Sequence, residues 1–222
     1  MQRIEDRGLV YYQFTALAAE PGLCHGFFTR LGGVSQSPYA TLNVGSSVGD
    51  DPAAVATNCG RCFAALGLRR SQVVTPFQVH GTRVARVGKA HAAQVIPNTD
   101  GLFTNEPGVA LFLRFADCVP IVLYDRERQA IGLVHAGWRG TLAGIAAEAV
   151  RAMAAALGSQ PRELWAGIGP AIGPCCYEVG QDLAERFAGR FGPHTVSQTP
   201  GERPRLDLAA ANTIALREAG VE

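Results

Sequence analysis

Long apolar runs are missing from this sequence. No stretch of about 18 consecutive apolar residues occurs, so we expect no transmembrane helix. The first 14 residues carry acidic side chains and lack the basic start and apolar stretch of a signal peptide. We therefore expect a cytoplasmic protein that does not act at a membrane.

An excess of charge of either sign is also missing. Lys and Arg number 20 against 19 Asp and Glu, which gives a net charge of +1. This balance argues against a nucleic-acid partner or an anionic membrane surface. Repeats and low-complexity linkers are absent too. What is present is a chain of 222 residues, 47% hydrophobic and 18% charged, which is long enough and apolar enough to bury a sizeable core.

The six cysteines are interpreted as thiols, ligands or core residues before disulfides, because the expected compartment is reducing. Cys59 and Cys62 lie on one helical face with Val55, Phe63 and Leu66, so we expect them to pack in the core. Cys175 and Cys176 are adjacent in a loop and poorly placed to bridge each other. The sequence supports neither a ligand role nor a redox role for them.

Strand and helix patterns mix without strict alternation. Asp50 or Asp51 is expected to cap a helix with Pro52 in its first turn. Further helices are predicted over 141–158, 181–191 and 206–220, and nearly continuous apolar runs predict strands over 119–125 and 130–138. The fold class is therefore α/β (α+β), with mixed β-sheets and packed helices rather than a doubly wound sheet.

Three side chains that could carry chemistry lie at the limits of apolar runs. They are His80 in FQVHG, Cys118 in FADCVP and His135 in LVHAG. A strand end followed by Gly or Pro points a side chain out of the sheet while its backbone stays anchored. Two imidazoles and a thiolate would hold zinc and leave its fourth position open. The alternative is that these residues simply pack in the core, where Cys is common and a lone His is hydrogen-bonded.

Arginines beside glycines suggest an anion site. Arg139 lies in HAGWRGT, where a strand is expected to lead into a helix, and Arg30 lies in FTRLGG. Together they could clamp a phosphate or carboxylate, although either could equally be a surface arginine. Asp117 immediately precedes Cys118, and a carboxylate inside an apolar stretch is costly unless something binds there.

The combination of motifs resembles a known family. The motifs are HGFFTRLGGVS, SPYATLNVG, QVHG, TDGLFT, ADCVPIVLYD, GLVHAGWRGT and IGPAIGPCCYEVG. They are similar to those of the laccase-domain family, also called multicopper polyphenol oxidoreductase-like or purine nucleoside phosphorylase of the laccase-domain type. The family includes the peptidoglycan editing factor. The resemblance extends from about residue 24 to the end.

The resemblance implies a single domain over residues 1–222, unlike the cupredoxin fold of true laccases. It implies a metal held by His80, Cys118 and His135, and phosphorolysis of adenosine, inosine and methylthioadenosine with adenosine deamination beside it. Copper-dependent phenol oxidation and a role in peptidoglycan composition are also associated with the family. Family members typically continue past LREAGV, so the end at Glu222 predicts a short C-terminal segment.

The first hypothesis is a zinc-dependent purine nucleoside phosphorylase with adenosine deaminase side activity, copper being the other candidate metal. At an open zinc site the pKa of bound water falls toward about 7, which suits attack on C6 of adenosine. The partners expected are a nucleoside and phosphate, with the chain a monomer or homodimer. The candidate substrate-binding residues are Arg30, Asn43, Gln78, Asp117, Arg139 and Thr141.

Three other hypotheses stay open. In the first, Cys118 is the nucleophile and His80 or His135 the base of a cysteine hydrolase of amide bonds, with peptidoglycan precursors as one setting. In the second, the protein is a copper-dependent polyphenol oxidase. The sequence has five histidines, which are too few to ligate the several copper ions of a multicopper oxidase. In the third, the metal only stabilises a binding module, which predicts unfolding on chelation.

Overall fold

The computed structural model describes all residues from 1 to 222. Contacts within the chain divide it into two compact units, Met1–Val73 and Val74–Glu222. Both contain strands and helices, and the sheets contain antiparallel and parallel pairs, so the predicted mixed α/β class is confirmed. The prediction of one domain over residues 1–222 is not decided by this division and stays a prediction.

The first unit has a small antiparallel sheet in the order β1-β2-β3. Its elements are β1 (Gln2–Asp6), β2 (Leu9–Gln13), α1 (Thr15–Ala18), β3 (Phe27–Phe28), α2 (Pro52–Ala65) and η1 (Arg70–Gln72). Helix α2 begins where the sequence predicts, because the Asp51 side chain accepts a hydrogen bond from the Ala53 amide. Val55, Cys62 and Phe63 are buried as predicted, whereas Cys59 and Leu66 of the same predicted face are half-buried.

The second unit contains a five-stranded sheet in the order β11-β9-β10-β7-β5. The strands are β5 (Val84–Arg86), β7 (Gly101–Thr104), β9 (Val119–Asp125), β10 (Ala130–Ala136) and β11 (Trp165–Ile168). The pairs within β11-β9-β10-β7 are antiparallel, and the β5–β7 pair at the edge is parallel. Strands β9 and β10 are nearly continuous apolar runs because they lie in the middle of this sheet.

Smaller elements complete the second unit. A three-stranded sheet has the order β6-β4-β8, and a two-stranded sheet pairs β12 with β13. The bounds are β4 (Val73–Pro76), η2 (Lys89–His91), β6 (Val95–Ile96), β8 (Ala110–Leu111), η3 (Pro161–Glu163), η4 (Pro193–Thr195), β12 (Val196–Ser197) and β13 (Arg205–Leu206).

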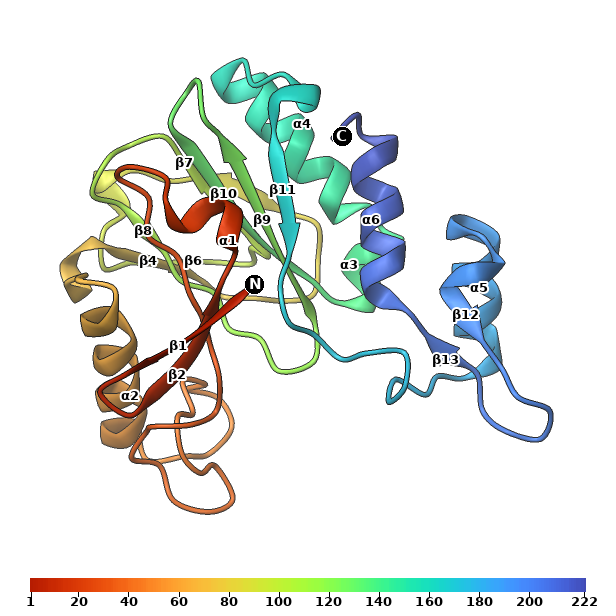
Figure 1. Ribbon diagram of the computed structural model, residues 1–222, viewed down its shortest axis with the longest axis horizontal. Helices are drawn as coiled ribbons and strands as arrows, with labels where there is room; N and C mark the ends of the chain where they lie inside the picture. Colours follow the sequence, from red (N-terminus) through yellow and green to blue (C-terminus); the bar gives the residue numbers. More distant parts are fainter. The chain divides into compact units, whose positions relative to one another are not determined.

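Four helices accompany the large sheet: α3 (Trp138–Leu142), α4 (Ile145–Leu157), α5 (Gln181–Phe191) and α6 (Leu208–Glu218). Figure 1 shows α3, α4 and α6 side by side next to β9, β10 and β11, with α4 in contact with β10 and α6 in contact with α4. The prediction of one helix over 141–158 is wrong at its start. Gly144 takes a φ of +87°, which breaks the hydrogen-bonded ladder and separates α3 from α4.

The core of the second unit lies between the large sheet and these helices. Ile121 and Leu123 of β9, Met153 of α4 and Phe187 of α5 have no exposed surface. Burying each such side chain contributes about 1.5–3 kcal/mol, so this cluster fixes the strands that carry the site described below. A second cluster around Val74 and Leu102 joins β4 to β7.

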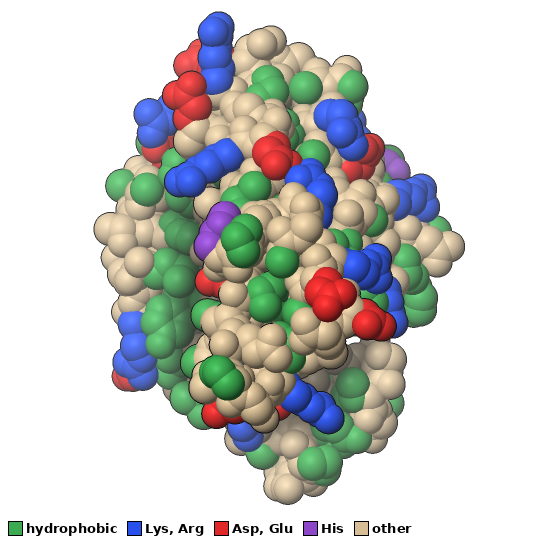
Figure 2. All heavy atoms as spheres, turned by 90° about the vertical axis from the view of Figure 1, so that its right-hand side faces the viewer, with side chains coloured by type: hydrophobic (Ala, Val, Ile, Leu, Met, Phe, Trp, Pro, Cys, Tyr) green, Lys and Arg blue, Asp and Glu red, His purple; other side chains and the backbone are tan.

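The helices and the surface agree with the composition. None of the helices has both the length and the apolar character needed to cross a bilayer. On the face that Figure 2 shows, acidic and basic side chains are interspersed and neither sign forms a continuous patch.

Candidate metal centre

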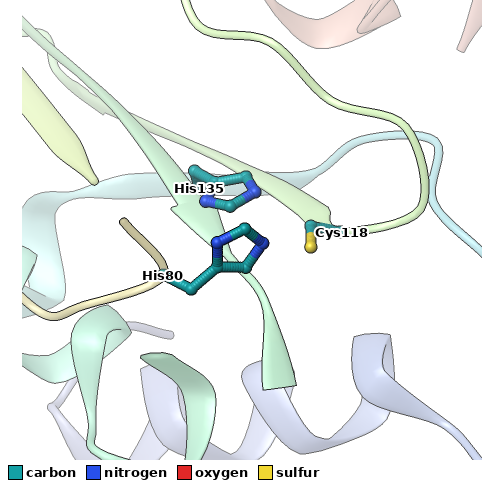
Figure 3. A group of neighbouring side chains, drawn as sticks. All are labelled: His80, Cys118 and His135. Atoms are coloured by element: carbon teal, nitrogen blue, oxygen red, sulfur yellow. The ribbon is translucent and has the colours of Figure 1, made fainter. Parts of the chain in front are cut away.

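His80, Cys118 and His135 come together in the second unit. Their ligand atoms all lie within 4.8 Å of one another, and Figure 3 shows the His80 ring facing the His135 ring and the Cys118 sulfur. The two imidazole rings meet edge to face with centroids 4.8 Å apart. His135 is buried, Cys118 is half-buried and His80 is exposed, so the group opens to solvent on the His80 side.

The β9–β10 hairpin positions Cys118 and His135. Its register pairs His135 with Pro120 and Ala136 with Val119. Cys118 immediately precedes β9, so it lies beside the residue that follows β10, which is Gly137. Two of the three candidate ligands are therefore fixed by backbone hydrogen bonds between neighbouring strands.

His80 is positioned by a loop, which corrects the expectation that it ends a strand. β4 stops at Pro76 and β5 starts at Val84. His80 takes a φ of +60°, a left-handed conformation that a strand cannot contain and that costs about 1 kcal/mol. The amides of Val79, His80 and Gly81 donate to the carboxylate of one residue, Asp100, at 2.9–3.0 Å instead of to a neighbouring strand.

Asp100 links this loop to His135. Its side chain is fully buried, and its Oδ1 lies 2.9 Å from Nδ1 of His135. Its main-chain oxygen also accepts from the His135 amide at 2.7 Å. An ionised carboxylate only accepts hydrogen bonds, so Nδ1 carries the proton and Nε2 of His135 is left for a metal.

Sequence reasoning missed Asp100. The motif TDGLFT was used only as one of the motifs that carry the family resemblance, and its Asp100 was given no role. The signal available was an Asp directly before the apolar strand β7, since a buried carboxylate there requires several donors.

The ionisation of the group follows from these contacts. Burial lowers the pKa of His135, but its hydrogen bonds and charge interactions with Asp100 and Cys118 outweigh burial and raise that pKa to about 9. Burial lowers the pKa of His80, and the charges of His135 and Arg139 lower it further against the opposing charge of Asp100. Burial raises the pKa of Asp100, but the hydrogen bonds it accepts from His135 and three backbone amides lower it overall. A metal ion binding at His135 therefore displaces a proton.

Gly137 lies against two of the candidate ligands. A Cβ atom at this position would be 2.8 Å from Cδ2 of His80 and 3.0 Å from Sγ of Cys118. Glycine is needed here for close approach and not for an unusual backbone, since the φ of Gly137 is −76°. This explains the first glycine of the HAGWRG motif.

The donor set fits a metal ion. Bonds of 2.0–2.1 Å to nitrogen and 2.3 Å to sulfur would place tetrahedral donors about 3.3–3.6 Å apart. The widest pair in the structure, at up to 4.8 Å, closes by about 1 Å to reach this geometry, and the exposed His80 side chain can make that movement. A carboxylate on the far nitrogen of a ligating histidine is the usual outer partner in zinc sites, and Asp100 supplies it. The metal itself is not identified by these contacts.

The other residues predicted around the site differ in placement. Arg139 is exposed, with its guanidinium stacked 4.6 Å from the centre of the Trp138 ring. Asp117 is exposed as well. Its apolar neighbours in the sequence predicted a buried carboxylate, and that expectation is wrong. Thr141 is buried and exchanges hydrogen bonds with Asn212.

Gln78 joins the two loops that carry His80 and Cys118. Its side-chain NH₂ donates to the Arg114 carbonyl at 2.8 Å, and its side-chain oxygen accepts from the Arg114 amide at 3.0 Å. Both ends of the amide are therefore occupied within the protein. This arrangement fixes one loop relative to the other.

Arg30 and Asn43 belong to the first unit. Arg30 donates to the Ala40 carbonyl at 2.9 Å. Asn43 donates to the Asp50 carboxylate at 2.8 Å and accepts from the Gly45 amide at 3.0 Å. Their predicted contacts with a substrate stay predictions.

The fold and the three-donor group define a mixed α/β protein with a candidate metal centre on a β-hairpin and a neighbouring loop. The chain belongs to the family described as multi-copper polyphenol oxidoreductase laccase, whose model matches residues 24–222. The predicted family membership is thereby confirmed.

Named relatives agree with this assignment. The chain is 38% identical over 211 residues to purine nucleoside phosphorylase YlmD of Geobacillus stearothermophilus, covering 90% of this chain and 77% of that protein. It is 42% identical over 202 residues to purine nucleoside phosphorylase ORF3 of Streptomyces griseus, covering 90% and 81%. The crystal structure of YlmD superposes with a TM-score of 0.90 at 37% identity, covering 99% of this chain and 84% of that one.

Proposed function

We propose that this protein is a metal-dependent purine nucleoside phosphorylase, with zinc as the metal and a nucleoside and phosphate as substrates. The observation that carries the proposal is the group of three donors held by the β9–β10 hairpin and the Asp100-bound loop. Relatives that align over most of this chain carry the name purine nucleoside phosphorylase, which supports the reaction class. The cytoplasm remains the predicted compartment.

The protein groups around the donors have separate tasks in this proposal. A metal ion held by His80, Cys118 and His135 supplies Lewis acidity toward a polar group of the substrate. Asp100 orients the His135 ring and fixes the backbone of the loop that carries His80 before substrate arrives, which reduces reorganisation in the reaction.

Arg139 is the proposed phosphate ligand. Its guanidinium is exposed and forms no salt bridge, and its charge is close enough to His80 to lower the pKa of that ring. Stacking on Trp138 restricts the guanidinium, so it loses less freedom when it binds an anion through two parallel hydrogen bonds. Phosphorolysis needs phosphate near C1′ while the purine leaves, and a fixed cation beside the centre serves that placement.

The remaining predicted substrate-binding residues keep smaller roles in the proposal. Asp117 is exposed and adjacent to Cys118, so it can meet substrate directly. Gln78 and Thr141 act through the loops they tie, because their polar atoms are already paired. Arg30 and Asn43 stay candidates for substrate contact.

Turnover of inosine tests the proposal. The wild-type protein with inosine and phosphate should release hypoxanthine and ribose 1-phosphate, and omission of phosphate should stop the reaction. Cys118→Ser and His135→Ala should each lower kcat/KM by at least about a hundredfold, since each removes a ligand of a site that organises the transition state. Cys24→Ser, which changes an exposed cysteine of the first unit, serves as the control. Unchanged turnover in both site variants would remove the site from the mechanism.

Adenosine deamination is a second activity proposed for the same centre. Adenosine without phosphate should yield inosine and ammonia, and this reaction should disappear in the same ligand variants. If adenosine yields adenine only when phosphate is present, and yields no inosine, the protein catalyses phosphorolysis and not deamination.

A cysteine hydrolase of amide bonds is the second candidate function. The observation that favours it is the order Cys118, His135, Asp100, in which Nδ1 of His135 is hydrogen-bonded to Asp100 and the ring lies within 4.8 Å of the Cys118 sulfur. This is the arrangement of a nucleophile, a base and a group that orients the base. Elemental analysis separates the candidates: stoichiometric zinc supports the phosphorylase. Alkylation of Cys118 at a rate that chelators do not change supports the hydrolase.

Phenol oxidation with copper has weaker support despite the wording of the family description. Only one group of three or more candidate metal-ligating side chains is found, and it suits a single ion. A multicopper centre needs several such groups. We therefore expect phenol oxidation to be slow beside nucleoside turnover.

A further inference from the structure

Two neighbouring cysteines outside the metal centre lie in direct contact. Cys175 and Cys176 follow β11 in the loop at 169–180, and both side chains are exposed. Their Sγ atoms are 3.4 Å apart. Adjacency in the sequence argues against a bridge, but this separation shows that the backbone directs both sulfurs to the same side.

The loop is anchored on both sides of the pair. Before it, the Ile172 amide donates to the carbonyl of Asp117 at 3.0 Å. After it, the Val179 amide donates to the Pro204 carbonyl and the Leu206 amide donates to the Tyr177 carbonyl. Between these anchors the Cys176 amide donates to the Gly173 carbonyl, which closes a tight turn. The two cysteines therefore lie in a turn whose ends are held by backbone hydrogen bonds.

The contact between the two sulfurs affects the ionisation of Cys176. The hydrogen bond and the charge of Cys175 raise the pKa of Cys176, and burial adds to this, while the charge of Arg205 opposes it. Cys176 therefore stays a thiol to a higher pH than an isolated cysteine does. One thiolate beside one thiol is the state in which an oxidised sulfur meets its resolving thiol at once.

Three of the other cysteines are less suited to this chemistry. Cys62 is buried, and burial together with the charge of Cys59 raises its pKa to about 12, so its thiolate is hardly formed. Cys24 is exposed, but burial of its sulfur raises its pKa. Cys118 faces His135 in the candidate metal centre and is engaged there.

We propose that Cys175 and Cys176 form a thiol–disulfide modification site that hydroperoxides oxidise and small dithiols reduce. One thiolate attacks a peroxide oxygen, the O–O bond breaks, and hydroxide leaves, giving a sulfenic acid. The neighbouring sulfur then attacks the sulfenic sulfur, the S–O bond breaks, and water leaves with the thiol proton. Overall, two thiols and one hydrogen peroxide give one disulfide and two waters. The proposal does not depend on the activity of the metal centre.

Mass spectrometry of the full chain, as purified with its metal, tests the proposal. The reduced protein is treated with equimolar hydrogen peroxide, blocked with iodoacetamide and digested. The wild type should lose the mass of two hydrogen atoms, with Cys175 and Cys176 in one unalkylated peptide, and dithiothreitol should restore alkylation of both.

Cys175→Ser and Cys176→Ser should each abolish this loss completely. Both side chains are exposed, so the variants should melt at the temperature of the wild type. Cys24→Ser, the matched control, should behave as the wild type. Full alkylation of Cys175 and Cys176 after peroxide treatment would overturn the proposal. So would loss of two hydrogens in the Cys175→Ser variant, because it would show that another pair is oxidised.

Discussion

Gly137→Ala tests the packing of the metal centre with the addition of a single methyl group. That group would lie 2.8 Å from the His80 ring, closer than Cβ atoms approach other heavy atoms, and 3.0 Å from the Cys118 sulfur, which is tighter than most Cβ contacts. The backbone of Gly137 is acceptable to alanine, so the clash with the two ligands is the main effect. Overpacking of this kind costs about 1–3 kcal/mol. In the metal-free protein the exposed His80 side chain can turn away, and the cost is largely avoided.

The added methyl group therefore destabilises the metal-bound state more than the metal-free state. A difference of about 1–3 kcal/mol corresponds to a loss of roughly 5- to 150-fold in metal affinity. Competition with a chromophoric zinc chelator measures this affinity, and thermal unfolding with chelator present measures the metal-free fold. Gly189→Ala, in helix α5 where a Cβ would meet nothing within 4 Å, is the control and should leave metal affinity unchanged. If Gly137→Ala binds zinc within about threefold of the wild type while Cys118→Ser does not bind it, our view of Gly137 is wrong.

Three further predictions concern stability. Asp100→Asn should lower the free energy of unfolding by about 2–5 kcal/mol, measured by urea denaturation, because an amide NH₂ cannot accept the hydrogen bonds that the carboxylate accepts from the loop. In the metal-free protein the pKa of His135 is raised from 6.5 to about 9. Protonated His135 therefore stabilises the folded state fully below pH 6.5, and this contribution is lost as the pH rises through 9. Urea denaturation at a series of pH values should show the free energy of unfolding falling by about 3 kcal/mol between pH 6 and pH 10. In the His135→Gln variant this dependence on pH should be much weaker. Phe187→Ala should lower the free energy of unfolding by about 3–5 kcal/mol, because the Phe187 side chain is fully buried. Phe77 is 56% exposed, so Phe77→Ala should change the free energy of unfolding by less than about 0.5 kcal/mol. Similar effects of the two variants in urea denaturation would contradict the core assignment.

Local patterns in the sequence predicted the elements that depend on local interactions. Helix α2 begins at Pro52 because Asp51 caps it, and both signals are adjacent in the chain. The break between α3 and α4 was missed because glycine is tolerated inside helices, and only the tertiary structure shows that Gly144 takes a left-handed conformation.

The candidate site was predicted in part. His135 and Cys118 could be placed at one sheet edge because each flanks an apolar run, and antiparallel pairing of neighbouring runs brings these positions together. His80 could not be placed this way, because the loop that carries it is held by the side chain of Asp100, 20 residues away. Pairing between a buried carboxylate and distant amides leaves no periodic trace in a sequence. Their places at the limits of apolar runs made His80, Cys118 and His135 candidates, and the resemblance to a family, rather than their spacing, favoured them as one ligand set.

The three candidate ligands are held unequally by the fold. His135 lies in a strand in the middle of the large sheet and Cys118 immediately precedes the neighbouring strand, whereas His80 is exposed on a loop. If this group holds an ion, we expect the loop imidazole to be the donor that releases it most readily, because only that side chain is on the solvent side and can rotate without disturbing the sheet. The exchange rate of the ion would then report on the mobility of one surface side chain.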